Sequence, residues 1–298
     1  MNWVRNSTPH ENNYPLYRAA LLVTVAGNIL LAVGKGIAAY LSGSVALYAD
    51  AANSVSDVLY SLLMALGMWV AIRPPDLSHP QGHSRFEPLV GLGISFSMAI
   101  AGLTAAQTSI NRLIEGGMAV APALPAIVML SAAAVKLGMF FFIRRIAKIL
   151  SSPTLKTTAV DNLNDVLTSL AAFVGAVGST YIHVLLDPMA GIIVAAWILR
   201  AAYRAAGENF GFLTGAGAGV ALRRQIVEIA QEVPGVISVH HTMTEYVGPH
   251  LVVDMHVNVD GEKSLNETHA ISDEIIHRIE ALPEVDRAYV HIEPEGYD

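Results

Sequence analysis

Long apolar stretches are the feature that most constrains how this chain folds. A helix needs roughly 20 mainly apolar residues to cross the ~30 Å hydrocarbon core of a bilayer. Six stretches of about that length or more occur before residue 207, separated by Gly and Pro residues that favour turns. The predicted helices are Leu16–Leu41, Ser44–Ile72, Leu89–Asn111, Pro122–Ile143, Thr157–Leu185 and Pro188–Ala206. These stretches are too long and too continuous for an amphipathic soluble bundle, so residues 16–206 predict a membrane domain.

Composition supports the membrane assignment. Charged residues make up only 14% of the chain and hydrophobic residues 53%, with a mean hydropathy of +0.47, whereas soluble domains carry about 25% charged residues. The absence of cysteine excludes disulfides and thiolate metal sites. Residues 1–15 are polar and have no signal-peptide pattern, so we expect a cytosolic N-terminal segment there.

The C-terminal part of the sequence has a different character. Residues 207–298 contain 5 Lys and Arg against 16 Asp and Glu, and 7 of the 11 histidines. A Gly-rich stretch, 207–219, is interpreted as a linker to a separate domain over 220–298. The acidic balance of this tail argues against nucleic-acid binding, which favours a basic face.

The distribution of Lys and Arg predicts how the helices cross the membrane. Positive residues are enriched in cytoplasmic loops. The ends expected on the opposite side carry only Arg112. The ends expected on the cytosolic side carry Arg5, Arg18, Arg73, Arg85, Arg144, Arg145, Lys148, Lys156, Arg200 and Arg204. Both termini are therefore predicted to be cytosolic, in the inner or plasma membrane of the cell.

Acidic residues inside two predicted helices indicate a cation site, since charges at bilayer depth are costly and usually functional. Asn53 and Asp57 are spaced i,i+4 in the second helix, and Asp50 is one heptad from Asp57. Asp161 and Asp165 repeat the i,i+4 spacing in the fifth helix.

The two pairs fall at matching depths. At ~1.5 Å per residue, Asn53 and Asp165 each lie roughly 14 Å from the outer surface, and Asp57 and Asp161 each roughly 20 Å. This coincidence predicts one transport site with four ligands, Asn53, Asp57, Asp161 and Asp165, and Asp50 as a further candidate.

The alternative is that these side chains only form hydrogen bonds between helices. That interpretation suits Asn53, Ser54 or Asn164, but neighbouring carboxylates in a low dielectric repel each other unless a cation or protons neutralise them. For Lys35 and Lys136 we expect snorkelling to the membrane surface, with a counter-charge role for Lys136 as the alternative.

Three motifs together resemble the cation diffusion facilitator family. They are GSVALYADAANSVSD, HPQGH and DNLND, and the resemblance extends from Leu16 to Glu293. It implies a cation efflux antiporter that exchanges a cytosolic divalent metal ion for protons, usually as a homodimer in the lipid membrane. It also implies that Asn53, Asp57, Asp161 and Asp165 occupy the four transport-site positions, none of which is His here, as in members associated with manganese.

The donor types favour the same group of metals. Carboxylate and amide oxygens are hard ligands that suit Mn²⁺ or Fe²⁺, whereas imidazole suits Zn²⁺ better. Zn²⁺, Cd²⁺ or Co²⁺ export by a member of the same family remains the alternative. A membrane metal sensor without transport is a further alternative, and an enzyme is not expected, since no HExxH motif or nucleophile–base pair is present.

The loop between the second and third predicted helices contains Asp76, His79 and His83. By resemblance, these three match a second metal site of some family members. The alternative is a solvated loop whose polar side chains cap helices.

The tail has the pattern of a small α/β domain. Helical spacing over Val220–Val233 and Leu265–Leu282 and alternation over Val236–Tyr246, Leu251–Asp260 and Arg287–Glu293 predict the order α-β-β-α-β. This order resembles the ferredoxin-like, metallochaperone-like tail of the same family.

The predicted strands have an apolar and a polar register. The apolar register contains Val239, Val253, Met255, Val257, Val290 and Ile292. The polar register contains His240, His256, His291 and Glu293. Together with His269, these four match tail metal-binding positions of the resembled family, so we expect a regulatory metal site there; the alternative is solvated histidines.

Overall fold

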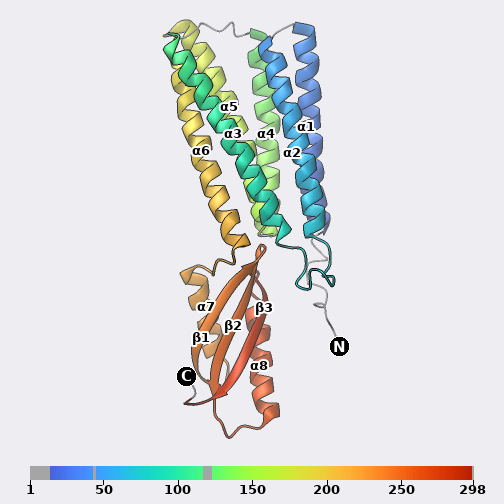
Figure 1. Cartoon of the computed structure of the whole chain (residues 1–298), viewed down its shortest axis with the longest axis vertical. Coiled ribbons are helices and arrows are strands. Elements are labelled where there is room, and N and C mark those ends of the chain that lie inside the picture. The colour runs from blue at the N-terminus through green and yellow to red at the C-terminus, as the bar shows by residue number, and fades with distance from the viewer. Residues whose placement is uncertain (1–13, 43–44, 117–122, 297–298) are drawn as a thin grey trace. The chain divides into compact units, whose positions relative to one another are not determined.

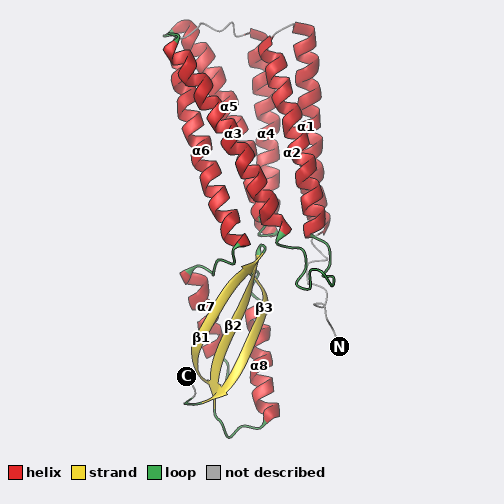
Figure 2. Cartoon of the chain, in the orientation of Figure 1, coloured by secondary structure: helices red, strands yellow, loops and turns green. Residues whose placement is uncertain are grey.

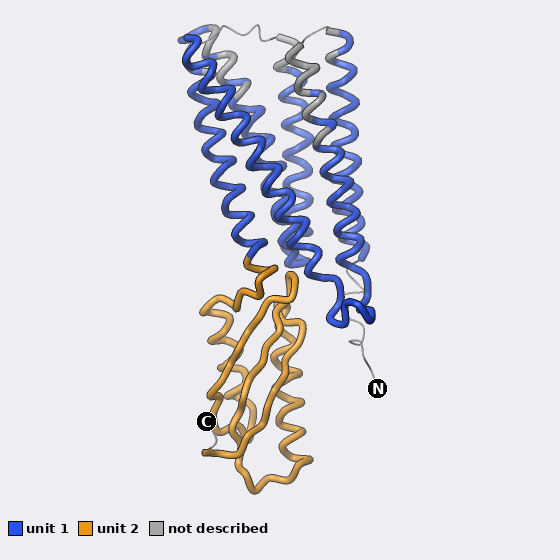
Figure 3. Tube along the Cα trace, in the orientation of Figure 1, with its two compact units in different colours: residues 1–210 blue, residues 211–298 orange. Residues whose placement is uncertain are grey.

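The computed structural model describes residues 14–42, 45–116 and 123–296, and some side chains within these ranges, including those of Asp50 and Asn53, lie outside the described part. The N-terminal segment expected at 1–15 falls almost entirely outside it. The chain divides into two compact units, residues 1–210 and 211–298 (Figure 3). The first is helical and the second combines helices with a sheet (Figure 2).

The first unit is a bundle of long helices (Figure 1). They are α1 Tyr14–Ser42, α2 Val45–Ala71, α3 Phe86–Ile114, α4 Ala123–Ile149, α5 Pro153–Tyr181 and α6 Leu186–Leu213. All six predicted helices are therefore present. Within the described residues, four helical stretches are long and apolar enough to span a membrane, Tyr14–Ala38, Phe86–Ile114, Ile127–Ile149 and Pro188–Leu213, and Asp57–Ala71 is a shorter apolar one.

The prediction of a linker from residue 207 was wrong, because α6 continues to Leu213. Asn209 explains the extension. Its side chain is buried, and its Nδ2 donates hydrogen bonds to Thr157 Oγ1 at 3.0 Å and to the Ala205 carbonyl at 2.8 Å. A Cβ at Gly91 would lie 2.1 Å from Asn209 Oδ1, so glycine there lets α3 approach α6. These contacts hold the last turns of α6 against α3 and α5.

The start of α5 is also anchored. Ser152 is the N-cap, and its hydroxyl accepts a hydrogen bond from the Leu155 N–H at 3.1 Å, with Pro153 at the first helical position. Ser152 also donates to Glu87, a carboxylate of α3 with only 3% of its surface exposed. Tyr17 of α1 donates to the same carboxylate at 3.5 Å. This network joins α1, α3 and α5 and sets the position of the acidic residues further along α5.

The second unit has the predicted α-β-β-α-β order. It contains α7 Val220–Gln231, β1 Val236–Val247, β2 His250–Val259, α8 Leu265–Glu280 and β3 Val285–Pro294. The sheet order is β1-β2-β3, with β1 antiparallel and β3 parallel to β2. Ser264 and Glu267 form a capping box that begins α8.

The core of this unit confirms the predicted apolar register. Val253, Met255 and Val257 of β2 are fully buried and pack with Ile226 of α7 and Ile275 of α8. Burying each such side chain contributes about 1.5–3 kcal/mol. Because both helices pack on this face through that core, the alternate residues of the strands lie on the other face, where the histidines are found.

Candidate functional site

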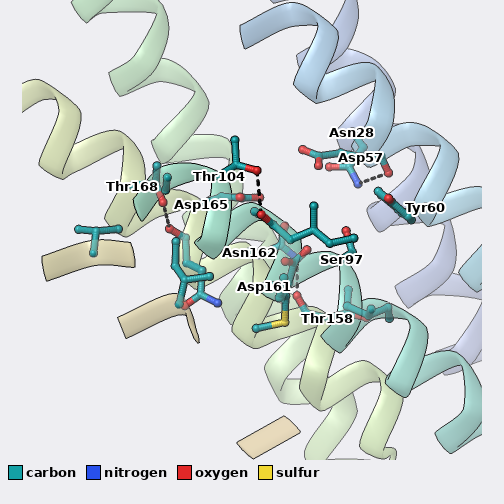
Figure 4. Close-up of a pocket in the computed structure, with 18 of the residues that line it drawn as sticks. Asn28, Asp57, Tyr60, Ser97, Thr104, Thr158, Asp161, Asn162, Asp165 and Thr168 are labelled. Carbon is teal, nitrogen blue, oxygen red and sulfur yellow. Dashed lines mark hydrogen bonds between the residues drawn. The ribbon is translucent and has the colours of Figure 1, made fainter. Parts of the chain in front are cut away.

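A cavity of about 550 Å³ in the helical unit contains the predicted carboxylates. Asp57 of α2 lines it together with Asp161 and Asp165 of α5, and residues of α1, α3 and α6 complete the wall (Figure 4). The structure thus brings together three residues that the sequence placed at matching depths. The other two candidates, Asp50 and Asn53, belong to α2, but their side chains lie outside the described part.

Lys136 of α4 reaches these carboxylates. Its Nζ lies 2.7 Å from Asp165 Oδ2 and 3.4 Å from Asp57 Oδ2, and its side chain is only 7% exposed. The expectation that Lys136 snorkels to the membrane surface was therefore wrong. The ammonium group is instead paired with carboxylates inside the bundle, because a buried charge is less costly when an opposite charge neutralises it.

The three carboxylates are not gathered as closely as a bound metal requires. Over the described ranges, ligand atoms of three acidic or His side chains come within 4.8 Å of one another in two places, the loop after α2 and the tail sheet. The cavity is not one of these places, and Lys136 contacts the acids of both helices there.

Neutral polar groups also line the cavity. Asn28 of α1 donates from Nδ2 to the Asp57 carbonyl at 3.4 Å, and its Oδ1 is buried without a hydrogen-bond partner. Both side-chain polar atoms of Asn164 are likewise buried and unpartnered. Among the described residues, Asn164 therefore does not form the interhelical hydrogen bond considered for it, and these amides can still bind an ion or water.

The donor chemistry of the cavity is dominated by oxygen. Where its lining is described, its polar side chains are carboxylates, amides, hydroxyls and the guanidinium of Arg112, with no histidine. Tyr60, Ser97 and Thr104 are among the lining residues that sequence reasoning missed, because a single neutral polar residue in a spanning helix carries no comparable signal.

The loop after α2 brings its three predicted ligands together. His83 Nε2 lies 3.4 Å from Asp76 Oδ2, and His79 Nδ1 lies 3.6 Å from Asp76 Oδ1. Backbone N–H groups of His79 and Ser78 donate to the Asp76 carboxylate and hold its pKa below the ordinary value. His83 is buried with Nδ1 unpartnered. One ligand atom from each of the three side chains lies within 4.8 Å of the others, a spacing that could hold a metal ion, and the same hydrogen bonds also shape the loop.

The tail sheet brings a second group together. Nitrogens of three histidines lie close to the Glu293 carboxylate of β3, with His240 Nε2 at 2.9 Å and both His256 Nδ1 and His291 Nε2 at 3.4 Å. The ligand atoms of His240, His256 and Glu293 all lie within 4.8 Å of one another. Two imidazoles and a carboxylate at this spacing suit a first-row transition metal.

His269 does not join this group. Its Nδ1 lies 3.5 Å from Asp273 on its own helix, α8, and it shares only a separate surface depression with Glu293. His241 was missed by sequence reasoning and lies close, with its ring centroid 5.1 Å from that of His256. A β-bulge between Val239 and His241 places His241 opposite His256, and an irregular register of this kind is not visible in simple alternation.

Together, the helical bundle, the acid-lined cavity and the His-rich tail define a membrane transporter for metal cations. The model of the cation efflux transmembrane domain matches residues 21–214, and that of the cation efflux protein cytoplasmic domain matches residues 221–295. The chain belongs to the cation efflux family, whose members are transporters of divalent metal cations.

Similar proteins cover nearly the whole chain. An uncharacterized transporter of Methanocaldococcus jannaschii is 34% identical over 92% of this chain and 96% of its own. The manganese efflux system protein MneS of Bacillus subtilis is 27% identical over 92% and 94%, respectively. The magnetosome protein MamM of Magnetospirillum gryphiswaldense is 29% identical over 87% and 85%.

Proposed function

We propose that this protein exports Mn²⁺ or Fe²⁺ in exchange for protons. The observation that carries the proposal is the single cavity in which Asp57, Asp161 and Asp165 converge from two helices. We assign these three residues as direct ligands and Asn53, one turn before Asp57, as a fourth ligand through its carbonyl oxygen.

The choice of metal rests on the oxygen donors. Mn²⁺ and Fe²⁺ accept carboxylate, amide and water ligands, whereas Zn²⁺ gains more from imidazole. Raw affinity still follows the Irving–Williams order and favours Zn²⁺, so selectivity must come from coordination geometry or from transport rates. One relative is named as a manganese efflux protein, which agrees with this choice.

Proton exchange follows from the same acids. Interacting carboxylates titrate as a coupled set, so protons can replace the ion when it leaves. The proposed direction is out of the cytosol. The cation-rich ends of the helices, including Arg73, Arg144 and Arg145, then face the cytosol in the inner or plasma membrane, with both termini on that side.

We further propose that the loop and tail groups bind regulatory metal. In the tail, His240, His256, His291 and Glu293 would bind the ion, and His269 would not. A cation there would offset the acidic charge of the tail and favour the pairing of two copies in a homodimer.

Flux into proteoliposomes with an imposed pH gradient tests the proposal. Wild type should move Mn²⁺ and Fe²⁺ faster than Zn²⁺, with opposite proton movement, and Asp57→Asn should fall to the rate of empty vesicles. Glu208→Gln, on α6 and paired with Lys156 outside the cavity, is the matched control and should keep wild-type flux. Faster Zn²⁺ flux would refute the choice of metal, and flux without proton movement would refute antiport.

A further inference from the structure

Lys136, whose ammonium contacts two acids of the cavity, is a charged group that the proposed function leaves unexplained. It extends from α4 toward acids on α2 and α5, and its ammonium contacts Asp165 at 2.7 Å and Asp57 at 3.4 Å. Asp161 lines the same cavity as these two acids. A single cation thus forms ion pairs with carboxylates of both helices that carry the proposed metal ligands.

The formal charges show what this cation does to the site. Taken by themselves, the three carboxylates and the ammonium that contacts two of them leave two negative charges, which a divalent ion balances; Arg112, in the last turn of α3, also lines the cavity. Without the ammonium, the site would carry three negative charges in a region of low dielectric, and their repulsion would be large when no metal is bound.

The positions of the carboxylate oxygens also indicate that the ammonium of Lys136 and a metal ion would interact with the same groups. The carboxylates are not gathered into a compact ligand group, and the ammonium contacts one oxygen on each helix. A metal ion that bridges Asp57 and Asp165 would bind the two carboxylates that the ammonium contacts. The ammonium and the metal therefore compete for the same ligands.

We propose, on the basis of the metal-export function above, that Lys136 is a tethered cation that bridges Asp57 and Asp165 when the metal is absent and is displaced when the metal binds. It keeps the empty site charge-balanced and limits metal affinity, so that the ion is released after transport. Lys136 is thus a positioning and release residue, not a metal ligand.

Mn²⁺ binding to the full-length protein, measured by calorimetry, tests this role. All variants carry His256→Ala, Glu293→Gln and Asp76→Asn so that tail and loop do not contribute. Lys136→Met, which keeps length but removes charge, should lower Kd by about tenfold or more and reduce the maximal Mn²⁺ flux by a similar factor. Lys136→Arg should stay near the reference in both. Lys148→Gln, an exposed lysine on the same helix, should match the reference.

An unchanged or weaker affinity in Lys136→Met would overturn the proposal, because a merely structural ion pair predicts no gain in binding. If the reference protein moves Mn²⁺ and Lys136→Met binds it equally, the lysine inference fails while the export function stands. If no metal is moved at all, the export function fails.

A second measurement does not depend on transport or on the single variant folding well. Metal-free Lys136→Met should unfold at a lower temperature than the reference, and adding Asp165→Asn should restore part of the loss, since it removes a repelling charge. If the double variant is no more stable than Lys136→Met, the charge-balancing role is wrong.

Discussion

The cavity of the helical bundle and the histidine group of the tail arrange their candidate metal ligands in different ways. In the cavity, the acidic groups are held apart and a lysine contacts two of them. In the tail, two imidazoles and a carboxylate already lie within 4.8 Å of one another on an open sheet face. A site that must release its ion benefits from a built-in competitor, whereas a site that reports metal benefits from preformed ligands.

The largest expected effect is a loss of metal affinity when the proposed tail ligands are replaced. His256→Ala with Glu293→Gln should weaken metal binding to the isolated 211–298 unit by about 100-fold or more, measured by calorimetry. The unit has its own buried core and is suited to this measurement. His269→Ala is the control and should change affinity less than about twofold, since His269 pairs with Asp273 instead. Equal losses in the two variants would mean that the metal site lies nearer α8.

A smaller effect is expected when a ligand type of the tail, an imidazole, is introduced into the cavity. Asn53→His supplies the cavity with the nitrogen donor that the tail already has, so the ratio of Zn²⁺ to Mn²⁺ flux should rise by about tenfold. Parallel flux assays in wild type and variant measure this ratio. An unchanged ratio would show that the ligand types in the cavity do not set its selectivity.

The smallest expected effect concerns the stability of the tail alone. Ser264→Ala removes the capping box of α8 and should cost the tail about 1 kcal/mol, with Asn266→Ala in the same turn as control. Hydrogen bonds from the Ser264 hydroxyl and N–H lower the pKa of Glu267 in the folded state.

The pH dependence of that difference has a definite sign. A lowered folded-state pKa stabilises the fold above the unfolded value near 4.5, and this contribution is lost as the pH falls through the folded value. The gap between wild type and Ser264→Ala should therefore narrow below about pH 4.5. Thermal unfolding of the tail unit at several pH values tests this, and a gap that widens in acid would contradict it.

Sequence reasoning succeeded where a signal is local and periodic. The helices were found because their apolar stretches are long, and Asp57, Asp161 and Asp165 because i,i+4 spacing and depth can be counted along a helix. The apolar strand register was equally direct, since alternation places Val253, Met255 and Val257 on one face.

It failed where a partner comes from a distant element. The contact of Lys136 with Asp57 joins residues 79 positions apart, and nothing in α4 alone shows it. The extension of α6 past residue 206 depends on Asn209 meeting Thr157 of α5. His241 lies next to the tail group because of a β-bulge that simple alternation does not reveal. His269 was predicted to belong to this group but instead contacts Asp273, one turn away on the same helix.

We propose that the cavity acids move the metal and that the tail histidines only sense it. The most direct test compares maximal Mn²⁺ flux in proteoliposomes for Asp161→Asn and for the triple tail variant His240→Ala, His256→Ala, Glu293→Gln. We expect Asp161→Asn to abolish flux, whereas the tail variant should keep the wild-type maximal rate and change only the metal concentration at which that rate is reached. A tail variant as inactive as Asp161→Asn, or wild-type flux in Asp161→Asn, would contradict it.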